Sequence, residues 1–333
     1  MRICMVLLTG LGDVVHGLPI VNAIKRAWPT AHITWVVEPM PSGILRPHPS
    51  VDDVIIFHKK AGWRGVLQLR DELRHRRFDL ALNFNIYFKS IFPTFFSHAR
   101  RRVGFDRGRA RDGVWLFANE HLEPGPRKHT QDLFLEFLDV IGIPSEPLQW
   151  LIPITETEKL EQEAFFESLT DRPIVGVVGA SANVKKDWPA ANYPELVNQL
   201  VSRFDARVIL LGGPGEREQS IARYILDEAQ YEPTWALGDS IRRLIWLIDR
   251  CHLLIAPDTG PVHIARALEV PVIGLYGHTN PCRVGPYRKY EDLWIDRYNE
   301  PGAAPDPSNA EPKHGRMELI SVADVMEKVA CVF

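Results

Sequence analysis

The chain has 333 residues, of which 45% are hydrophobic and 24% are charged. This composition is typical of a folded globular protein and excludes a disordered chain. The mean hydropathy is −0.13, and no apolar run approaches the roughly 20 residues that span a bilayer. The apolar start is too short for a signal peptide. We therefore expect a cytoplasmic protein, or one bound to the cytoplasmic face of a membrane. At roughly 100–200 residues per domain, the length predicts two domains.

Charge is divided unevenly along the chain. Residues 1–150 hold 20 Lys and Arg against 15 Asp and Glu, whereas the remainder holds 19 against 27. Within residues 59–111 there are 14 basic and four acidic side chains. Such a block is either a solvated surface or a binding surface for an anionic partner: nucleic acid, an acidic lipid headgroup or a phosphorylated sugar.

Cysteine usage predicts neither a disulfide framework nor a structural zinc site. The four cysteines lie far apart and form no C-x-x-C pair. Both kinds of framework need closely patterned cysteines. We therefore expect no metal.

Strand and helix patterns alternate along the first half of the chain. Buried-strand runs occupy residues 3–8, 33–37, 54–57 and 80–83, with helices predicted at 14–28 and 63–76. Such alternation predicts a parallel sheet covered on both faces. A proline-rich stretch at 144–153 then predicts a linker, so the first domain is expected over residues 1–153.

The same rhythm restarts after a linker helix expected within residues 154–172, which opens with a Thr155/Glu158 capping box and runs to about residue 169. A second α/β domain is expected over residues 173–316. Its predicted strands are 174–178, 207–211, 253–256 and 272–276. A last helix over 317–333 is expected to fold back on the N-terminal domain.

The first motif is Gly10-Leu11-Gly12-Asp13, between the first strand and the first helix. It half resembles a dinucleotide fingerprint, with Glu38 placed like the ribose-binding acid, but Val15 replaces the third glycine. Asp13 has two interpretations at this stage. It either stabilises the helix start, worth roughly 0.5–2 kcal/mol, or acts as a catalytic carboxylate.

The second motif, Asp258-Thr259-Gly260-Pro261-Val262-His263, directly follows a predicted strand. Proline suits the first helical position, and Asp or Thr suits the cap. A helix start of this kind presents backbone N–H groups to an anion. His263 would lie one turn inside. The alternative is a capped helix with a buried histidine.

Two further turns carry polar side chains after strands. The loop after the strand at 174–178 carries the Ser181 hydroxyl and two cations, Lys185 and Lys186, which suit a diphosphate, while Trp188 is expected to anchor this loop. Glu216 follows the Gly-rich turn 212–215, where it can accept from ribose hydroxyls or stabilise the helix start.

Together, and in this order, these motifs resemble glycosyltransferase family 9, the ADP-heptose:lipopolysaccharide heptosyltransferases. The Asp-Thr-Gly-Pro-x-His block is the most specific part. Residues 14–16 and 35–38 resemble heptosyltransferase I more than II. The resemblance runs from the first residue to about Pro286, where the segment 277–286 matches Gly-x-Thr-x-Pro-x-Arg-x-Gly-Pro.

The resemblance implies a GT-B fold, with two Rossmann-like doubly wound α/β domains facing a central cleft. It implies inverting, metal-independent transfer of heptose from ADP-heptose to an inner-core lipopolysaccharide acceptor, either Kdo-lipid A or a heptosylated core. ADP-heptose is then a co-substrate, and no cofactor is expected. Asp13 would be the catalytic base. The nucleotide sugar would contact Ser181, Lys186, Glu216, Asp258, Thr259, Gly260 and His263.

For the acceptor, the expected residues of the N-terminal domain are Gly12, Arg64, Lys89 and Arg101. The basic character of this domain suits phosphates and Kdo acids, and we expect no nucleic-acid partner. The sequence departs from the family pattern at His278 and Ala182 and within residues 83–85. The aromatic stretch 91–96 either touches a bilayer or packs into the core.

Other classes of function remain as alternatives. One is a transferase of the same fold with another nucleotide sugar or acceptor. Another is a non-catalytic nucleotide-sugar-binding protein. A nicotinamide-dependent oxidoreductase would use Gly10, Gly12 and Glu38, but the missing third glycine counts against it.

Overall fold

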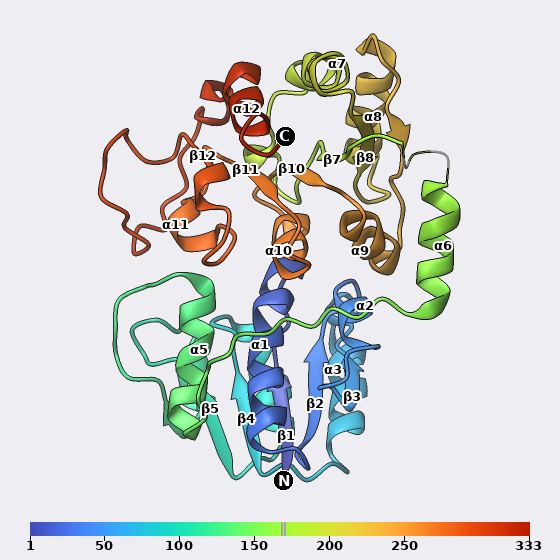
Figure 1. The fold of residues 1–333 in the computed structure, drawn as a ribbon. Coiled ribbons are helices and arrows are strands. Elements are labelled where there is room, and N and C mark those ends of the chain that lie inside the picture. Colours follow the sequence, from blue (N-terminus) through green and yellow to red (C-terminus); the bar gives the residue numbers. More distant parts are fainter. Residues whose placement is uncertain (168, 170) are drawn as a thin grey trace. The chain divides into compact units, whose positions relative to one another are not determined.

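The computed structural model describes residues 1–167, 169 and 171–333. The chain divides into two compact units, Met1–Pro153 and Ile154–Phe333. Each unit contains one six-stranded sheet in which neighbouring strands run parallel, flanked by helices (Figure 1). Among the described residues, no helix is both long enough and apolar enough to cross a membrane.

The elements of the first unit alternate as the hydrophobic pattern predicts. Its strands are β1 (Arg2–Val6), β2 (His32–Val37), β3 (Asp53–Ile56), β4 (Leu80–Asn83), β5 (Arg101–Gly104) and β6 (Glu120–His121). Its helices are α1 (Leu11–Ala27), α2 (Ser42–Leu45), α3 (Trp63–Leu73), α4 (Ile91–Phe96) and α5 (Thr130–Ile141).

The second unit repeats the alternation. Its strands are β7 (Ile174–Val178), β8 (Arg207–Leu211), β9 (Thr234–Trp235), β10 (Leu253–Pro257), β11 (Val272–Tyr276) and β12 (Ile295–Asp296). Its helices are α6 (Glu156–Phe166), α7 (Asn192–Phe204), α8 (Glu216–Glu228), α9 (Ile241–Asp249), α10 (Gly260–Ala267), α11 (Pro281–Val284) and α12 (Val322–Val329).

Strand order places a potential ligand site in each unit. The first sheet has the order β3-β2-β1-β4-β5-β6 and the second has β12-β11-β10-β7-β8-β9. The direction in which the chain adds strands therefore reverses between β1 and β4, and again between β7 and β10. In doubly wound sheets, ligands bind beyond the carboxyl ends of the strands at this switch point.

In the first unit, alternate residues of β1 serve two different cores. Cys4 and Val6 pack with apolar residues of α3 in one buried cluster, which Phe92 and Phe96 of α4 partly cover. On the other face, α1 packs against α5. The sheet is buried on both faces, as expected for parallel strands joined by helices.

Gly17 lies where α1 crosses the sheet, and we expect Gly17→Ala to destabilise the protein. A Cβ atom there would lie 2.6 Å from the Cη2 atom of the fully buried Trp35. Overpacking of this kind costs about 1–3 kcal/mol, which exceeds the gain of about 1 kcal/mol in helix propensity. Urea unfolding should show a lower midpoint, whereas Gly125→Ala, whose Cβ meets only an atom 3.9 Å away, should not.

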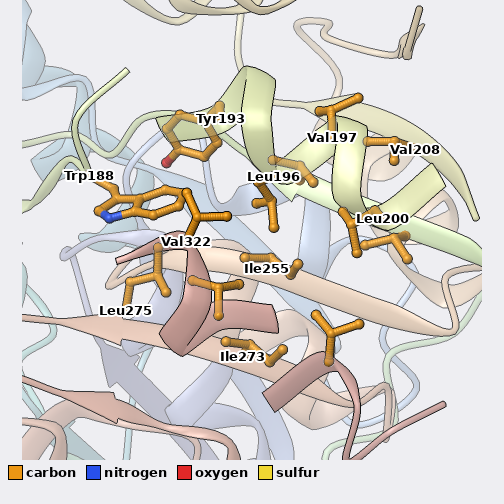
Figure 2. Close-up of a cluster of buried hydrophobic side chains, with 14 of the residues drawn as sticks. Trp188, Tyr193, Leu196, Val197, Leu200, Val208, Ile255, Ile273, Leu275 and Val322 are labelled. Atoms are coloured by element: carbon orange, nitrogen blue, oxygen red, sulfur yellow. The ribbon is translucent and has the colours of Figure 1, made fainter. Parts of the chain in front are cut away.

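The core of the second unit joins α7 and α12 to the sheet. Figure 2 shows Tyr193, Leu196 and Leu200 of α7 beside Val322 of α12, above Ile273 of β11. The last helix, which the sequence predicts to fold back on the N-terminal domain, thus turns its apolar side chains toward the sheet of its own unit. The apolar side chains of α12 are buried in the second unit's own core.

Trp188 connects this core to the loop after β7. Its side chain is 1% exposed, and its Nε1 donates to the Ile320 carbonyl at 2.8 Å. Trp188 therefore anchors the loop, as the sequence indicates.

Helix α6 is fastened by an ion pair. Arg242 of α9 donates to the Glu158 carboxylate at 2.6 and 2.5 Å. The helix has the predicted Thr155/Glu158 capping box. It ends at Phe166, and residue 168, within the predicted end near 169, lies outside the described residues.

Hydrogen bonds from Arg242 lower the pKa of Glu158, which makes the contribution of this ion pair pH-dependent. A carboxyl group whose pKa is lower in the folded state than in the unfolded state contributes stability at pH values above the unfolded-state pKa. This contribution is lost as the pH falls through the folded-state pKa. Glu158→Gln, which retains a capping-box side chain, should therefore cost about 1–3 kcal/mol at neutral pH and progressively less in acid. The exposed Glu161→Gln on the same helix is the control, and equal pH profiles of unfolding for the two variants would contradict the assignment.

Candidate functional site

The carboxyl ends of three strands in the second unit meet at Asp258. This buried residue directly follows β10. Its Oδ2 accepts from Lys186 Nζ at 2.6 Å and from Thr279 Oγ1 at 2.7 Å. Lys186 follows β7 and Thr279 follows β11. The fold thus brings together a carboxylate, an ammonium and a hydroxyl from three turns.

Helix α10 begins beside this cluster. Thr259 is its N-cap residue, makes no side-chain capping bond and is followed by Gly260 and Pro261 in the first turn. The first N–H groups of a helix have no partner within the helix and favour anions. His263 lies one turn inside and is buried. The turn thus has the helix start and the buried histidine that the sequence predicts, and anion binding there stays a prediction.

Tyr276, the last residue of β11, is fully buried near Asp258. Burial, together with the negative charges of Asp258 and Asp296, raises the pKa of its hydroxyl. The phenol therefore stays protonated and neutral at physiological pH.

Ser181 is placed differently from the simple expectation of a phosphate ligand. Its hydroxyl lies 2.8 Å from the Asn183 carbonyl and 2.9 Å from Asp187 Oδ1. The Ser181 backbone N–H also donates to Asp187 Oδ1, at 2.7 Å. In this structure the hydroxyl is engaged in shaping its own loop.

Arg217 completes that loop, and sequence reasoning missed it. Its guanidinium donates to the Ser181 carbonyl, and its Nε lies 3.3 Å from Asp187 Oδ2. Arg217 follows Glu216 at the start of α8. Only the folded loop shows that it reaches back to the turn after β7.

Two carboxylates follow β8, one of them exposed to solvent and the other hydrogen-bonded within the protein. Glu216, the expected ribose ligand, is exposed as the first residue of α8. Glu218 instead accepts from the Gly213 N–H at 3.3 Å. Glu218 also borders a small pocket at the ends of β7 and β8, whose apolar walls include Val177, Gly179, Ala180, Leu211, Ile225 and Leu237.

In the first unit, Asp13 lies in the first turn of α1, after β1. The helix is capped by Gly10, which has no side chain to form a capping bond. Asp13 is therefore not the N-cap residue, although its carboxylate is placed where the helix dipole favours negative charge. It is partly exposed, as is the neighbouring Gly12.

Lys89 lies at the same end of the first sheet. Its Nζ donates to the Leu8 carbonyl at 3.3 Å and to Glu38 Oε1 at 2.7 Å. Lys59 Nζ lies 2.8 Å from the other Glu38 oxygen. Glu38 is thus held by two ammonium groups, which counts against its use as a free ribose-binding acid. Lys59 joins this cluster although the sequence did not single it out.

The expected acceptor residues Arg64 and Arg101 do not lie together. Arg64 is exposed in the first turn of α3, which follows β3 and so starts at the carboxyl side of the sheet. Arg101 is the first residue of β5, paired in register with Leu80 at the start of β4. It therefore lies at the amino edge of the sheet, away from the Asp13 turn, and its role in acceptor binding stays a prediction.

Arg101 has a structural partner instead. Its guanidinium donates to both carboxylate oxygens of Glu120, at 2.7 and 2.8 Å. These bonds lower the pKa of Glu120. The basic residues of the block 59–111 are thus divided between the two edges of the parallel sheet, with Arg64 at the carboxyl edge and Arg101 at the amino edge.

Within the described residues, no group of three or more His, Cys, Asp or Glu side chains is arranged to hold a metal ion. The cations of the site are side chains, chiefly Lys186 in the second unit and Lys59 and Lys89 in the first.

A family model for glycosyltransferase family 9 (heptosyltransferase) matches residues 66–304. The lipopolysaccharide core heptosyltransferase OpsX of Haemophilus influenzae is 31% identical over 299 residues, covering 90% of this chain and 85% of that protein. The lipopolysaccharide heptosyltransferase 1 of Pseudomonas aeruginosa is 27% identical, covering 86% of this chain and 81% of that protein.

Solved structures share the fold. A family 9 glycosyl transferase from Veillonella parvula superposes with a TM-score of 0.85 at 23% identity, covering 99% of this chain and 96% of that one. Escherichia coli heptosyltransferase WaaC with ADP-2-deoxy-2-fluoro heptose gives 0.77 at 20% identity and 99% coverage of both chains. The predicted fold class, two Rossmann-like parallel sheets of the GT-B type, is confirmed.

The extent of the family match and the identity to OpsX define the class of this protein as a glycosyltransferase. The chain belongs to glycosyltransferase family 9, the heptosyltransferase family. It is an enzyme that transfers glycosyl groups, as the sequence motifs predict.

Proposed function

We propose that this enzyme transfers heptose from ADP-heptose to an inner-core lipopolysaccharide acceptor on the cytoplasmic face of the inner membrane. The observation that carries the proposal is the Asp258 cluster, in which Lys186 and Thr279 converge beside the start of α10. A family 9 relative has been solved with an ADP-heptose analogue, and relatives are named for lipopolysaccharide core transfer. Both facts favour the same substrates here.

The donor is proposed to bind the second unit. A diphosphate carries negative charge, and Lys186 together with the N–H groups at Thr259 and Gly260 supplies a cation and a helix dipole to hold it. The loop that carries Lys186 is kept in shape by Asp187 through Ser181 and Arg217. Ser181 then contributes chiefly by fixing the loop.

The nucleoside is proposed to occupy the neighbouring part of the same edge. Glu216 and Glu218 border the turn after β8, and either carboxylate can accept from ribose hydroxyls.

The acceptor is proposed to bind the first unit, near Asp13. Lys59, Lys89 and Arg64 lie at the carboxyl side of that sheet and suit the phosphates and sugar acids of an inner core. Glu38 already shares its charge with both lysines, so an anionic acceptor would compete with an internal carboxylate.

Transfer is proposed to invert the anomeric centre. The acceptor oxygen forms a bond to the anomeric carbon on the side opposite the diphosphate, while the bond from that carbon to the phosphate oxygen breaks. Asp13 accepts the proton of the attacking hydroxyl, and ADP leaves with the bonding electron pair. Lys186 and the α10 N–H groups stabilise the charge that develops on ADP, so no metal is required.

The test is ADP release from ADP-heptose with and without heptose-free Kdo-lipid A, and with a heptosylated core as a second acceptor. We expect release that depends on one acceptor, an inverted anomeric configuration in the product, and the same rate in EDTA. The substrate assignment would be contradicted if ADP were released with neither of the two acceptors while another nucleotide sugar or another acceptor supported turnover. Tight ADP-heptose binding without turnover would instead indicate a binding protein.

A further inference from the structure

Six aromatic rings form a continuous surface on the first unit. We define the aromatic surface as Trp63, Phe88, Phe92, Phe95, Phe96 and Phe117. Neighbouring ring centroids lie 5.6 to 6.4 Å apart along this series: Trp63–Phe92 6.2 Å, Phe88–Phe92 5.6 Å, Phe92–Phe96 6.4 Å, Phe95–Phe96 5.7 Å and Phe95–Phe117 6.3 Å. The rings come from α3, from the turn Phe88–Ser90 and the helix α4 that follows it, and from the turn Val114–Phe117 after β5.

Packing in the core explains only part of this surface. Ile91 and Thr94 of α4 are buried, and Phe92 and Phe96 partly cover the cluster beneath. In contrast, Trp63 is 75% exposed, Phe88 55% and Phe95 56%. Leu67, Tyr87 and Leu116, from the same segments, are also exposed. Large apolar side chains that are exposed together on one solvent-facing surface mark an interaction site.

The segments that carry the aromatic surface are rich in basic residues. The segments that form it, residues 59–67, 87–100 and 107–117, contain eight Lys and Arg residues and a single acid, Asp112. Among the basic residues, the exposed ones include Lys60, Arg64, Arg100, Arg107 and Arg111. Arg111 lies over the Tyr87 ring, with its Cζ 5.8 Å from the centroid.

We propose that the aromatic surface docks this enzyme onto an anionic lipid bilayer. Aromatic rings favour the headgroup level of a bilayer, where one part of the ring is apolar and another is wet. Cations beside them are attracted to anionic headgroups. A second copy of this chain fits less well, because two such surfaces would bring like charges together.

The surface also lies beside the acceptor side of the first sheet. Lys89 follows Phe88 in the same turn, and its Nζ reaches the Leu8 carbonyl ahead of the Asp13 turn. A bilayer at the aromatic surface would therefore lie next to that end of the sheet. Docking to a bilayer does not depend on the proposed reaction. Vesicle binding and glycosyl transfer can therefore be tested independently, and either result can be negative without the other.

The test is co-sedimentation of the full chain with vesicles of phosphatidylethanolamine containing phosphatidylglycerol, against neutral phosphatidylcholine vesicles. We expect binding to the anionic vesicles that weakens in high salt. The triple variant Trp63→Ser, Phe88→Ser, Phe95→Ser should bind about tenfold or more weakly, and so should Lys60→Gln, Arg107→Gln, Arg111→Gln.

The matched control replaces exposed apolar residues of the second unit: Leu160→Ser, Tyr224→Ser, Leu319→Ser. It should bind vesicles like the wild type, and thermal unfolding should show that all variants are folded. Equal binding to anionic and neutral vesicles, or binding unaffected by both triple variants, would overturn the proposal. So would a wild-type dimer in analytical ultracentrifugation that the aromatic variant converts to a monomer, because the surface would then join two copies.

Discussion

The variant Asp13→Asn should bind ADP-heptose like the wild type and lose acceptor-dependent ADP release by about 10²–10⁴-fold. Asparagine keeps the shape of the side chain but cannot accept the proton of the attacking hydroxyl. Donor binding should persist because the proposed donor residues lie in the other unit. Calorimetric titration with ADP-heptose in the absence of acceptor and a steady-state assay of ADP release measure the two quantities separately.

The same variant distinguishes catalysis from a purely structural role. Because Asp13 lies in the first turn of α1, loss of its charge should cost only about 0.3–1 kcal/mol of stability. Unchanged transfer with a slightly lower melting temperature would return Asp13 to the structural role. Asp71→Asn, an exposed carboxylate on α3, controls for the loss of one negative charge in the same unit.

Lys186→Ala should reduce kcat/KM for ADP-heptose by about 10²–10³-fold. The change removes the ammonium group proposed to stabilise the departing ADP. It also leaves Asp258, whose side chain is 7% exposed, without its cation next to the incoming diphosphate. Both effects act against binding and transfer, so we expect weaker ADP affinity as well as slower turnover.

Lys185→Ala is the matched control, because the neighbouring lysine has the same charge but is exposed. It should change kcat/KM by no more than about twofold. Equal losses in the two variants would show that only the general charge of the loop matters. No loss in Lys186→Ala would contradict the proposed donor site.

The sequence was sufficient for the fold because hydrophobic runs are strong local signals. The strand predicted at 174–178 is β7, and the strand predicted at 272–276 is β11. The convergence on Asp258 also follows from sequence, since polar residues after neighbouring parallel strands meet at one edge. Thr279, although part of the matching segment, was not identified as a site residue.

Contacts between residues far apart in the chain could not be predicted from the sequence. Arg101 stands in a basic run, yet its position at the start of β5 separates it from Asp13. The choice between Glu216 and Glu218 depends on which way the first turn of α8 faces, which local pattern does not determine. The placement of α12 depends on which apolar core its buried side chains join, which the sequence pattern of the helix does not determine.

The contact between Lys186 and Asp258 supplies the lysine with a counter-ion from the protein itself. If the proposed donor site is correct, an arriving diphosphate competes with Asp258 for the Lys186 ammonium group, so donor binding exchanges one anion for another. The same exchange would run backwards as the proposed product ADP departs, which would moderate the affinity for ADP.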